Sequence, residues 1–386
     1  MSFRPDYLPF GRPDFTDEEI DAVARVMRSG WIGMGPETQA FEQELAAAVG
    51  APHVVTVNSC TSALFLALLA QGIGAGDDVI CPSLTWCSTA NAVLYAGANP
   101  VFCDVDPDTF CVTPSTVLRA LTPRTKAVMV VHFGGLAVDT RSLREALPRS
   151  VAIIEDAAHA FGARFPDDSP VGSSGNATCF SFYANKNLST GEGGAVALFD
   201  SAQADRIRSL RQHALPVDAW KRFTHSTTIM LTQQLSELGY KANYTDLQAA
   251  IGRVQLRRSS AMATKRRHLA DAYLEHVAGA GSPLHPQDGV VSTRHALHLF
   301  TVRVGASALT PRDALLLELR RRNIGATIHY TVLHLMPLYL RGKPPVSLPV
   351  TEAIGRDILT LPTSASMSQA DIEYVCHHVR ELTGLS

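Results

Sequence analysis

In the 386-residue chain, residues 151–159 read VAIIEDAAH, an apolar run followed by two carboxylates and an imidazole. Its first four residues are apolar, as in a buried β-strand, and the carboxylates of Glu155 and Asp156 stand where that strand ends. His159 follows three residues after Asp156. Because a carboxylate buried alone is costly, we expect Asp156 to meet a cationic or N–H partner. An aspartate that only caps the next helix is an equally good interpretation of this stretch alone.

Comparable apolar runs lie on both sides of this strand. They cover residues 54–57, 79–81, 101–105 and 127–131 before it, and residues 177–183 and 195–199 after it. Helical segments separate the earlier runs, and a glycine-rich turn joins the last two. Strands that alternate with helices predict βαβ crossovers. We therefore expect an α/β protein with a mostly parallel sheet and helices on both faces.

Flanking segments complete the predicted organisation. The capping box TDEE, residues 16–19, begins a helix that Gly30 ends. Toward the C-terminus the sequence predicts a long helix at 245–278, a strand at 297–304, a helix opened by TPRD at 310–313 with proline in its first turn, and a final helix at 368–382. We predict a large domain, residues 1–255, and a smaller α+β domain, residues 256–386.

Charge and composition exclude some classes of function. Lys and Arg number 34 against 36 Asp and Glu, a formal net charge of -2. No global positive field is therefore available to hold nucleic acid or an anionic membrane. Charged residues make up 18% of the chain, below the roughly 25% of an average domain. We expect part of the surface to be buried in an oligomer, at least a dimer.

The sequence also predicts a cytoplasmic protein without disulfides. Residues 45–76 carry no charge, but polar residues interrupt them well before the roughly 20 apolar residues that a bilayer requires. Residues 1–10 lack the apolar core of a signal peptide. The seven cysteines form no Cys-x-x-Cys pair. We therefore expect reduced thiols and no membrane partner.

Three further segments follow predicted strands, where open α/β sheets bind ligands. NSCTS, residues 58–62, offers hydroxyls and N–H groups to an anion, or is a simple N-cap. Trp86 offers an aromatic face to a planar ligand, or belongs to the core. Lys186, between a strand and the GEGG turn at 191–194, would be poorly solvated, which lowers the pKa of its amine and makes it a nucleophile. The alternative is a solvated surface lysine.

Taken together, these features match pyridoxal 5'-phosphate (PLP). An anion cradle, an aromatic platform, a carboxylate for a pyridinium and a lysine that forms a Schiff base are the parts that this cofactor requires. Two other patterns carry no function. The glycines at 72–76 lack the dinucleotide-binding spacing, and adjacent side chains of Cys376-His377-His378 would point apart on a helix. We therefore predict no metal site.

The chain resembles the DegT/StrS family of PLP-dependent sugar aminotransferases, which have the aspartate aminotransferase type I fold. The resemblance runs nearly from end to end and is carried by residues 29–32, 35–36, 58–64, 76–80, 104–106, 122–127, 131–132, 155–160, 180–182 and 186–187. Within the family, residues 82–89, Ala158-His159 and residues 328–330 look most like the enzymes that aminate UDP-4-keto-pentose to make 4-amino-4-deoxy-L-arabinose.

The resemblance implies a role for each candidate residue. Lys186 would form the Schiff base and later move the proton, and Asp156 would hold the pyridinium N–H. His159 would contact the phenolic oxygen of PLP, and Trp86 would stack on its ring. Phosphate contacts would come from Cys60, Thr61, Ser181 and Asn243 of the partner subunit.

The implied reaction is a ping-pong transamination from an amino acid, L-glutamate by resemblance, to a nucleotide-linked keto sugar. The resemblance further implies a homodimer with shared active sites. Substrate-side candidates are Trp31, Gly33, His329 and Tyr330. Two alternatives are PLP-dependent sugar dehydration or deoxygenation, against which Lys186 argues, and a non-catalytic regulatory protein with the same fold. Residues 221–238 match the family poorly, and we predict no role for them.

Overall fold

The structure is a computed structural model that describes residues 3–215, 235, 237–279, 281–341 and 344–385. The segment 221–238, for which the sequence predicts no role, lies largely outside these residues. None of the described helices combines the length and the apolar character that crossing a bilayer requires. All seven cysteines are free, as expected from their spacing.

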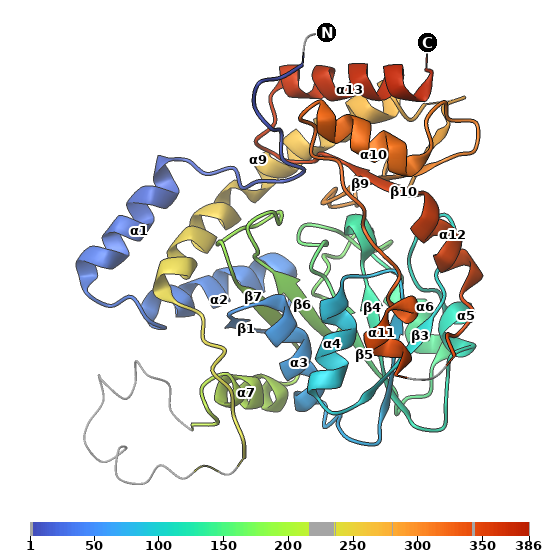
Figure 1. Cartoon of the computed structure of the whole chain (residues 1–386). Coiled ribbons are helices and arrows are strands. Elements are labelled where there is room, and N and C mark those ends of the chain that lie inside the picture. Colours follow the sequence, from blue (N-terminus) through green and yellow to red (C-terminus); the bar gives the residue numbers. More distant parts are fainter. Residues whose placement is uncertain (1–2, 216–234, 236, 280, 342–343, 386) are drawn as a thin grey trace.

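A seven-stranded sheet forms the centre of the molecule (Figure 1), with strand order β1-β7-β6-β5-β4-β2-β3. Only β7 runs against its neighbours β1 and β6, and the other pairs are parallel. The predicted mostly parallel sheet is therefore confirmed. Its strands are β1 (His53–Val57), β2 (Asp78–Pro82), β3 (Asn99–Cys103), β4 (Thr125–Val131), β5 (Ala152–Asp156), β6 (Ala177–Ser181) and β7 (Gly194–Leu198).

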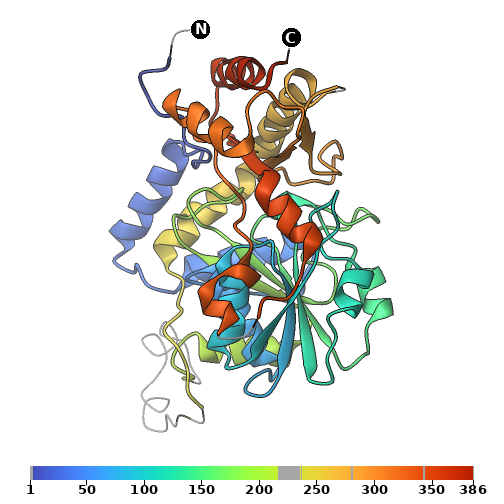
Figure 2. The ribbon, with the colours of Figure 1, turned by 45° about the vertical axis from the view of Figure 1, so that its right-hand side comes forward.

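Helices cover both faces of this sheet (Figure 2), because its strands are apolar on both sides. Alternate residues point to opposite faces. Val55 and Val57 of β1 belong to the core beneath α3 (Cys60–Ala70), α4 (Cys87–Tyr95) and α7 (Ser201–Leu210). Val54 belongs to the opposite core, beneath α2 (Pro36–Val49). Farther along that face, α5 (Pro114–Leu118) and α6 (Thr140–Ala146) pack on β2, β4 and β5.

Two long helices tie the parts together. The capping box at Thr16 begins α1 (Asp17–Ser29), and Gly30 ends it, as predicted. The first half of α9 (Asp246–His276) packs on α1 through Ala250 and Val254. Its second half contributes Leu269 and Tyr273 to a different core. The predicted connecting helix is therefore present, and it spans both cores.

The second core lies above the main sheet in Figure 1. It is built on an antiparallel sheet of order β10-β9-β8, with β8 (Leu284–Pro286), β9 (Phe300–Val304) and β10 (Ile358–Leu361). The helices α10 (Arg312–Arg321) and α13 (Gln369–Thr383) cover it. Pro311 is the N-cap of α10 and stands one residue before the helix, in place of the predicted first-turn position.

Segments missed by the sequence patterns link the two cores. Neither α11 (Pro337–Leu340), α12 (Pro349–Asp357) nor β10 was predicted. Ile354 of α12 packs against the main sheet, and the N-terminal residue Leu8 packs in the second core. Leu8 accepts a hydrogen bond from Gly325 at 2.8 Å. The domain division at residue 255 stays a prediction, and the Leu8 contact crosses it.

Candidate active site

A cavity of about 580 Å³ opens at the carboxyl ends of β1, β5 and β6. The strand ends supply Asp156 and Ser181, and the turn before α3 supplies Ser59 to Thr61. The C-terminal part supplies His298 and residues 327–330. The cavity therefore lies where the main sheet meets the second core, at the edge that the sequence predicts for ligands.

Lys186 lines this cavity from the turn after β6. Burial lowers the pKa of its amine to about 8, while the nearby Cys60 and Asp156 act in the opposite direction. An amine with this pKa is partly uncharged at neutral pH, so it is able to attack a carbonyl carbon. This is the direction that the sequence position predicts, and the alternative of a solvated surface lysine does not describe the site.

Asp156 ends β5 and is 6% exposed. Thr89 donates a hydrogen bond to its Oδ2 at 2.8 Å, and the backbone N–H of Ala158 donates to Oδ1 at 3.2 Å. Burial raises the pKa of this carboxyl, although Thr89, Ala158 and Lys186 oppose the rise. A cationic N–H at this place would relieve the burial cost, so the site fits a pyridinium ring.

Asp156 also accepts a hydrogen bond from the N–H of Ala158, two residues on, but residues 157–176, all of them described, contain no helix, so the helix-capping interpretation is wrong. The sequence did not predict Thr89. Its hydroxyl accepts from Thr85 at 2.9 Å because its own proton goes to Asp156. Thr89, in the first turn of α4, orients the carboxylate, and Thr85, just before the N-cap Trp86, supports Thr89.

His159 and Tyr330 meet beside Lys186. The backbone N–H of Gly134 donates to Nδ1 of His159 at 3.3 Å. Burial, with the positive charge of Lys186 nearby, lowers the pKa of His159 well below its usual range. The ring is therefore neutral and protonated on Nε2, which donates to the Tyr330 hydroxyl oxygen at 2.9 Å. His329, the neighbour of Tyr330, contacts the Thr360 hydroxyl at 2.9 Å.

The predicted aromatic platform and anion cradle also line the cavity. Trp86 is 60% exposed, and its ring centroid lies 5.8 Å from that of Tyr330. Ser59 is the N-cap of α3 and accepts from the N–H of Ser62. This cap does not involve the N–H groups of Cys60 and Thr61, which point out of the first turn of the helix. The N-cap and the cradle therefore coexist.

Gly194 keeps this cradle close to the sheet. A Cβ atom at this position would lie 2.6 Å from the backbone nitrogen of Cys60. Gly194 begins β7 and pairs with Val57, the last residue of β1. The missing side chain therefore lets the N-terminus of α3 approach the strand ends.

Three predicted residues lie elsewhere in the protomer. Asn243, Trp31 and Gly33 are not among the described residues that line the cavity. The amide oxygen of Asn243 is buried and has no hydrogen-bond partner within the described part of the chain. The loop that holds Trp31 and Gly33 is fixed to α9, because Asp246 accepts from the N–H of Gly35 at 2.8 Å.

Two residues near Lys186, Asn187 and His298, carry no role predicted from the sequence. The Nζ atom of Lys186 lies 3.3 Å from Nε2 of His298. The Oδ1 atom of Asn187 lies 3.3 Å from Nδ1 of the same ring. His298 follows an apolar pair just before β9, and only its polarity at a strand edge could have drawn attention to it.

A histidine cluster on α13 corrects one argument from the sequence. The ligand atoms of His377, His378 and Glu381 lie within 4.8 Å of one another, so adjacent positions do not keep these side chains apart. Arg322, however, donates to Nδ1 of His378 at 2.8 Å and to Glu381 at 2.9 Å. A guanidinium cation thus already lies between these groups.

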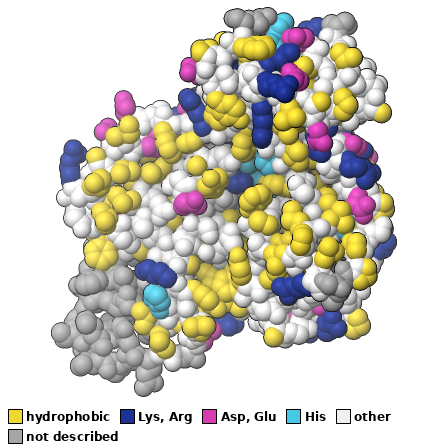
Figure 3. Space-filling model, viewed as in Figure 1, with side chains coloured by type: hydrophobic (Ala, Val, Ile, Leu, Met, Phe, Trp, Pro, Cys, Tyr) yellow, Lys and Arg dark blue, Asp and Glu magenta, His cyan; other side chains and the backbone are white. Residues whose placement is uncertain are grey.

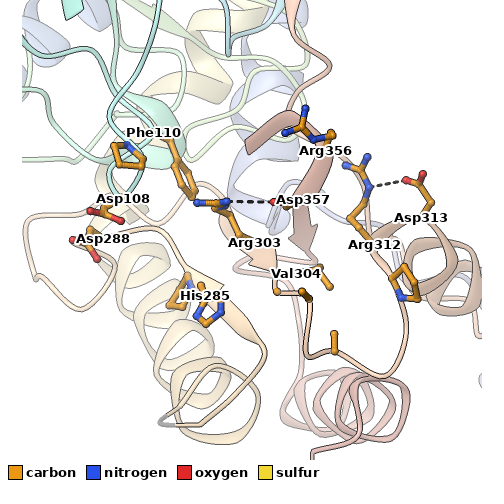
Figure 4. Close-up of a pocket in the computed structure, with 16 residues that line it drawn as sticks. Asp108, Phe110, His285, Asp288, Arg303, Val304, Arg312, Asp313, Arg356 and Asp357 are labelled. Carbon is orange, nitrogen blue, oxygen red and sulfur yellow. Dashed lines mark hydrogen bonds and ion pairs between the residues drawn. The ribbon is translucent and has the colours of Figure 1, made fainter. Parts of the chain in front are cut away.

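A second hollow, of about 900 Å³, lies beside β9 and α12 (Figure 4). It contains two ion pairs: Arg303 contacts Asp357 at 3.2 Å, and Arg312 contacts Asp313 at 2.6 Å. Three arginines and four aspartates line the hollow, so it has no field of one sign to attract a charged ligand.

Comparisons with known proteins agree with this geometry. The model of the DegT/DnrJ/EryC1/StrS aminotransferase family matches residues 13–380. The spore coat polysaccharide biosynthesis protein SpsC of Bacillus subtilis (strain 168) is 41% identical over 387 residues, which cover 98% of each chain.

Solved structures are similar over nearly the whole chain. DesV of S. venezuelae, in complex with a ketimine intermediate, is 35% identical with a TM-score of 0.84, covering 97% of this chain and 98% of its own. Spr1654 of Streptococcus pneumoniae, named as a sugar aminotransferase and solved in its PMP form, is 29% identical with a TM-score of 0.90, covering 98% and 99%. A PLP form of Spr1654 is similar as well. The chain therefore belongs to the DegT/DnrJ/EryC1/StrS aminotransferase family and is a PLP-dependent sugar aminotransferase.

Proposed function

We propose that the cavity transfers an amino group from L-glutamate to the keto group of a nucleotide-linked 4-keto sugar. The observation that carries this proposal is the pairing, in one cavity, of a lysine amine of lowered pKa with a buried carboxylate. PLP, when bound, supplies an electron sink for the carbon from which a proton is removed. The residues of the cavity would hold the cofactor and move the proton.

Holding the cofactor is the first task of the site. Asp156 would meet the ring nitrogen, His159 the phenolic oxygen and Trp86 one face of the ring. Cys60, Thr61 and Ser181 would contact the phosphate. No lysine or arginine is needed there, because the N–H groups of a helix N-terminus and hydroxyls bind phosphate. The near-zero net charge of the chain is consistent with this kind of site.

Moving the proton is the task of Lys186. Its uncharged amine would accept the proton from the α-carbon of the amino acid, so the C–H bond breaks and an N–H bond forms. The resulting ammonium would then donate this proton to a different carbon, on the cofactor. The second half of the cycle would run in reverse on the keto sugar.

The candidate substrate-side residues lie in two places. His329 and Tyr330 line the cavity, whereas Trp31 and Gly33 lie on a loop that would have to reach a neighbouring site. Residues 82–89 and 328–330 favour a UDP-linked 4-keto-pentose. The similarity to SpsC, named for spore coat polysaccharide biosynthesis, agrees with an amino sugar as product. A cytoplasmic location stays a prediction.

A homodimer with shared sites follows from the same proposal. The loop around Trp31 and the buried amide of Asn243 lie outside their own cavity. Figure 3 shows apolar side chains gathered over the lower part of one face and mixed charges over the upper part. Large exposed apolar residues include Ile32, Trp86, Tyr95, Tyr183 and Leu238. A second copy of the chain would cover such residues.

A substrate screen tests the proposal. Purified protein is incubated with L-glutamate and keto-sugar nucleotides that differ in nucleotide and in keto carbon, and 2-oxoglutarate is measured. We expect release of one 2-oxoglutarate for each amino sugar formed, with a 4-keto sugar preferred. Loss of a sugar hydroxyl without 2-oxoglutarate would instead establish the elimination reaction.

A further inference from the structure

Asn187 and His298 form a connected pair behind the amine of Lys186. His298 is 3% exposed, and its two ring nitrogens have different partners. Its Nε2 lies 3.3 Å from Nζ of Lys186, and its Nδ1 lies 3.3 Å from Oδ1 of Asn187. The amide nitrogen of Asn187 donates to the carbonyl of Ala296 at 2.8 Å.

These contacts determine which nitrogen of His298 carries the proton. Because the amide nitrogen of Asn187 is bound to a carbonyl, its oxygen must face the histidine. An amide oxygen only accepts, so Nδ1 of His298 is the donor. Burial and the nearby positive charges of Lys186 and Arg266 lower the pKa of His298 well below its usual range. The neutral ring therefore presents an unprotonated Nε2 to Lys186.

The remaining groups around Lys186 act in both directions. Asp156 and Cys60 raise the pKa of its amine, and Arg266 lowers it. His159 and His329 also feel the charge of Lys186, and burial keeps both rings neutral. His298 differs from these groups because its hydrogen-bond acceptor, Nε2, lies 3.3 Å from Nζ of Lys186. A neutral acceptor stabilises an ammonium more than an amine.

We infer that Asn187 and His298 are positioning residues for the amine of Lys186. Asn187 holds the tautomer of His298, and Nε2 of His298 fixes the direction of Nζ and stabilises the ammonium that carries the transferred proton. The inference rests on the proposed function for its role in turnover, but the hydrogen bond itself does not depend on PLP.

Two measurements on PLP-free protein test this pair. The first is the nitrogen NMR spectrum of protein labelled with ¹⁵N-histidine, in which His298 should show a protonated Nδ1 and an unprotonated Nε2. The opposite pattern would overturn the inference. The second is the pKa of Lys186, obtained from the pH dependence of its competitive acetylation, read by mass spectrometry.

Variants of His298 and Asn187 should shift the pKa of Lys186 in predictable directions. H298F keeps a ring but has no acceptor, so the pKa of Lys186 should fall by about one unit, a tenfold change in the ratio of ammonium to amine. H298Q restores an acceptor and should recover most of this shift. N187L leaves Lys186 unaltered but removes the amide oxygen that keeps the proton of His298 on Nδ1. It should therefore shift the pKa of Lys186 in the same direction as H298F. H285F, an exposed histidine on β8, is the matched control.

The outcomes separate this inference from the proposed function. If H298F leaves the pKa of Lys186 unchanged while the wild-type protein still transaminates, the positioning role is wrong and the function stands. If the pKa shifts but no amino acid converts PLP to its amine form, the pair is real and the proposed function fails. In turnover, H298F should lower kcat and shift its pH profile to lower pH, with KM little changed, because the acceptor acts on the proton-bearing lysine.

Discussion

At the scale of the residue, Asp156 combines a cost to stability with a chemical task. Its pKa is raised by burial, so the ionised form is disfavoured in the folded, cofactor-free protein. Such a group stabilises the fold below its unfolded pKa, and this contribution is lost as the pH rises through its folded pKa. At neutral pH the cofactor-free protein therefore carries an unfavourable charge that a pyridinium would relieve.

We predict opposite effects of D156N on stability and activity. Thermal unfolding at pH 7 should show a cofactor-free variant at least as stable as the wild type. Turnover should fall by about 100-fold or more, because the ring nitrogen loses its counter-charge. PLP should stabilise the wild type more than the variant. A variant with near-normal turnover would contradict the role of Asp156.

The hydroxyl of Thr89 offers a smaller test of the same carboxylate. T89V removes a hydrogen bond of 2.8 Å with little change of shape. We expect turnover to fall about tenfold, since a hydrogen bond to a charged group contributes about 1.5–3 kcal/mol. The rate of the glutamate half-reaction, followed by the cofactor spectrum, measures this. S88A, a neighbour on the cavity wall, is the control, and an equal effect there would point to general disturbance of α4.

The sequence could predict Lys186 and Asp156 because each follows a recognisable apolar strand. His298 could not be predicted in this way, because its partner lies 112 residues away in the chain. No helix or strand repeat in the sequence brings Lys186 and His298 together. Only the packing of the second core against the main sheet does so. Thr89 was missed because a buried hydroxyl in a helix has no distinctive pattern.

At the scale of the element, β5 presents two acids with different tasks. Alternation along the strand sends Glu155 and Asp156 to opposite faces. Glu155 is fully buried and lies 2.9 Å from Nε2 of His132. Burial raises the pKa of Glu155, but hydrogen bonds from His132, Ser174 and Asn176 outweigh it, and the net shift is downward. Glu155 is therefore structural, which the sequence alone does not reveal.

We predict that E155Q changes stability and its dependence on pH. A carboxylate of lowered pKa stabilises the fold above its unfolded pKa, and this contribution is lost as the pH falls through its folded pKa. Urea unfolding should show a less stable variant at pH 7, with the difference shrinking toward acidic pH. Bound PLP should keep its yellow colour. A stability difference that grows toward acidic pH would refute this assignment.

The contact between β7 and α3 gives a further prediction. G194A places a Cβ atom 2.6 Å from the backbone of Cys60, so the helix N-terminus must shift. We expect a loss of about 1–3 kcal/mol in unfolding free energy and weaker PLP binding, measured by fluorescence titration. G74A, whose Cβ would meet only an ordinary contact at 3.6 Å, is the control. Unchanged PLP affinity in G194A would argue against the phosphate cradle.

Some helices and strands could be predicted from the sequence, and others could not. The main strands and α1 were predicted because long apolar runs and a capping box are local signals. The strand β10 and the helices α11 and α12 are short, with four, four and nine residues respectively. Their positions follow from long-range packing, such as the pairing of Leu359 with Val302.

At the scale of the whole molecule, two cores meet at the cavity, and a second copy is proposed to complete it. Mixing subunits tests this. K186A and N243L are each expected to be impaired as pure dimers, but half of the dimers in an equal mixture are hybrids with one intact site if the sites are shared. Refolded mixtures should recover about a quarter of wild-type activity. Activity no greater than the average of the two parents would place each site within one protomer.

A single half-reaction at Lys186 decides whether the site transfers an amino group. PLP-loaded protein is mixed with L-glutamate in the absence of a keto sugar, and the absorbance of the cofactor and the amount of 2-oxoglutarate are followed together. Our account predicts conversion of PLP to its amine form with one 2-oxoglutarate per site in the wild type, and no borohydride-reducible linkage or catalytic cycling in K186A. Conversion by the wild type without 2-oxoglutarate, or full turnover by K186A, would contradict it.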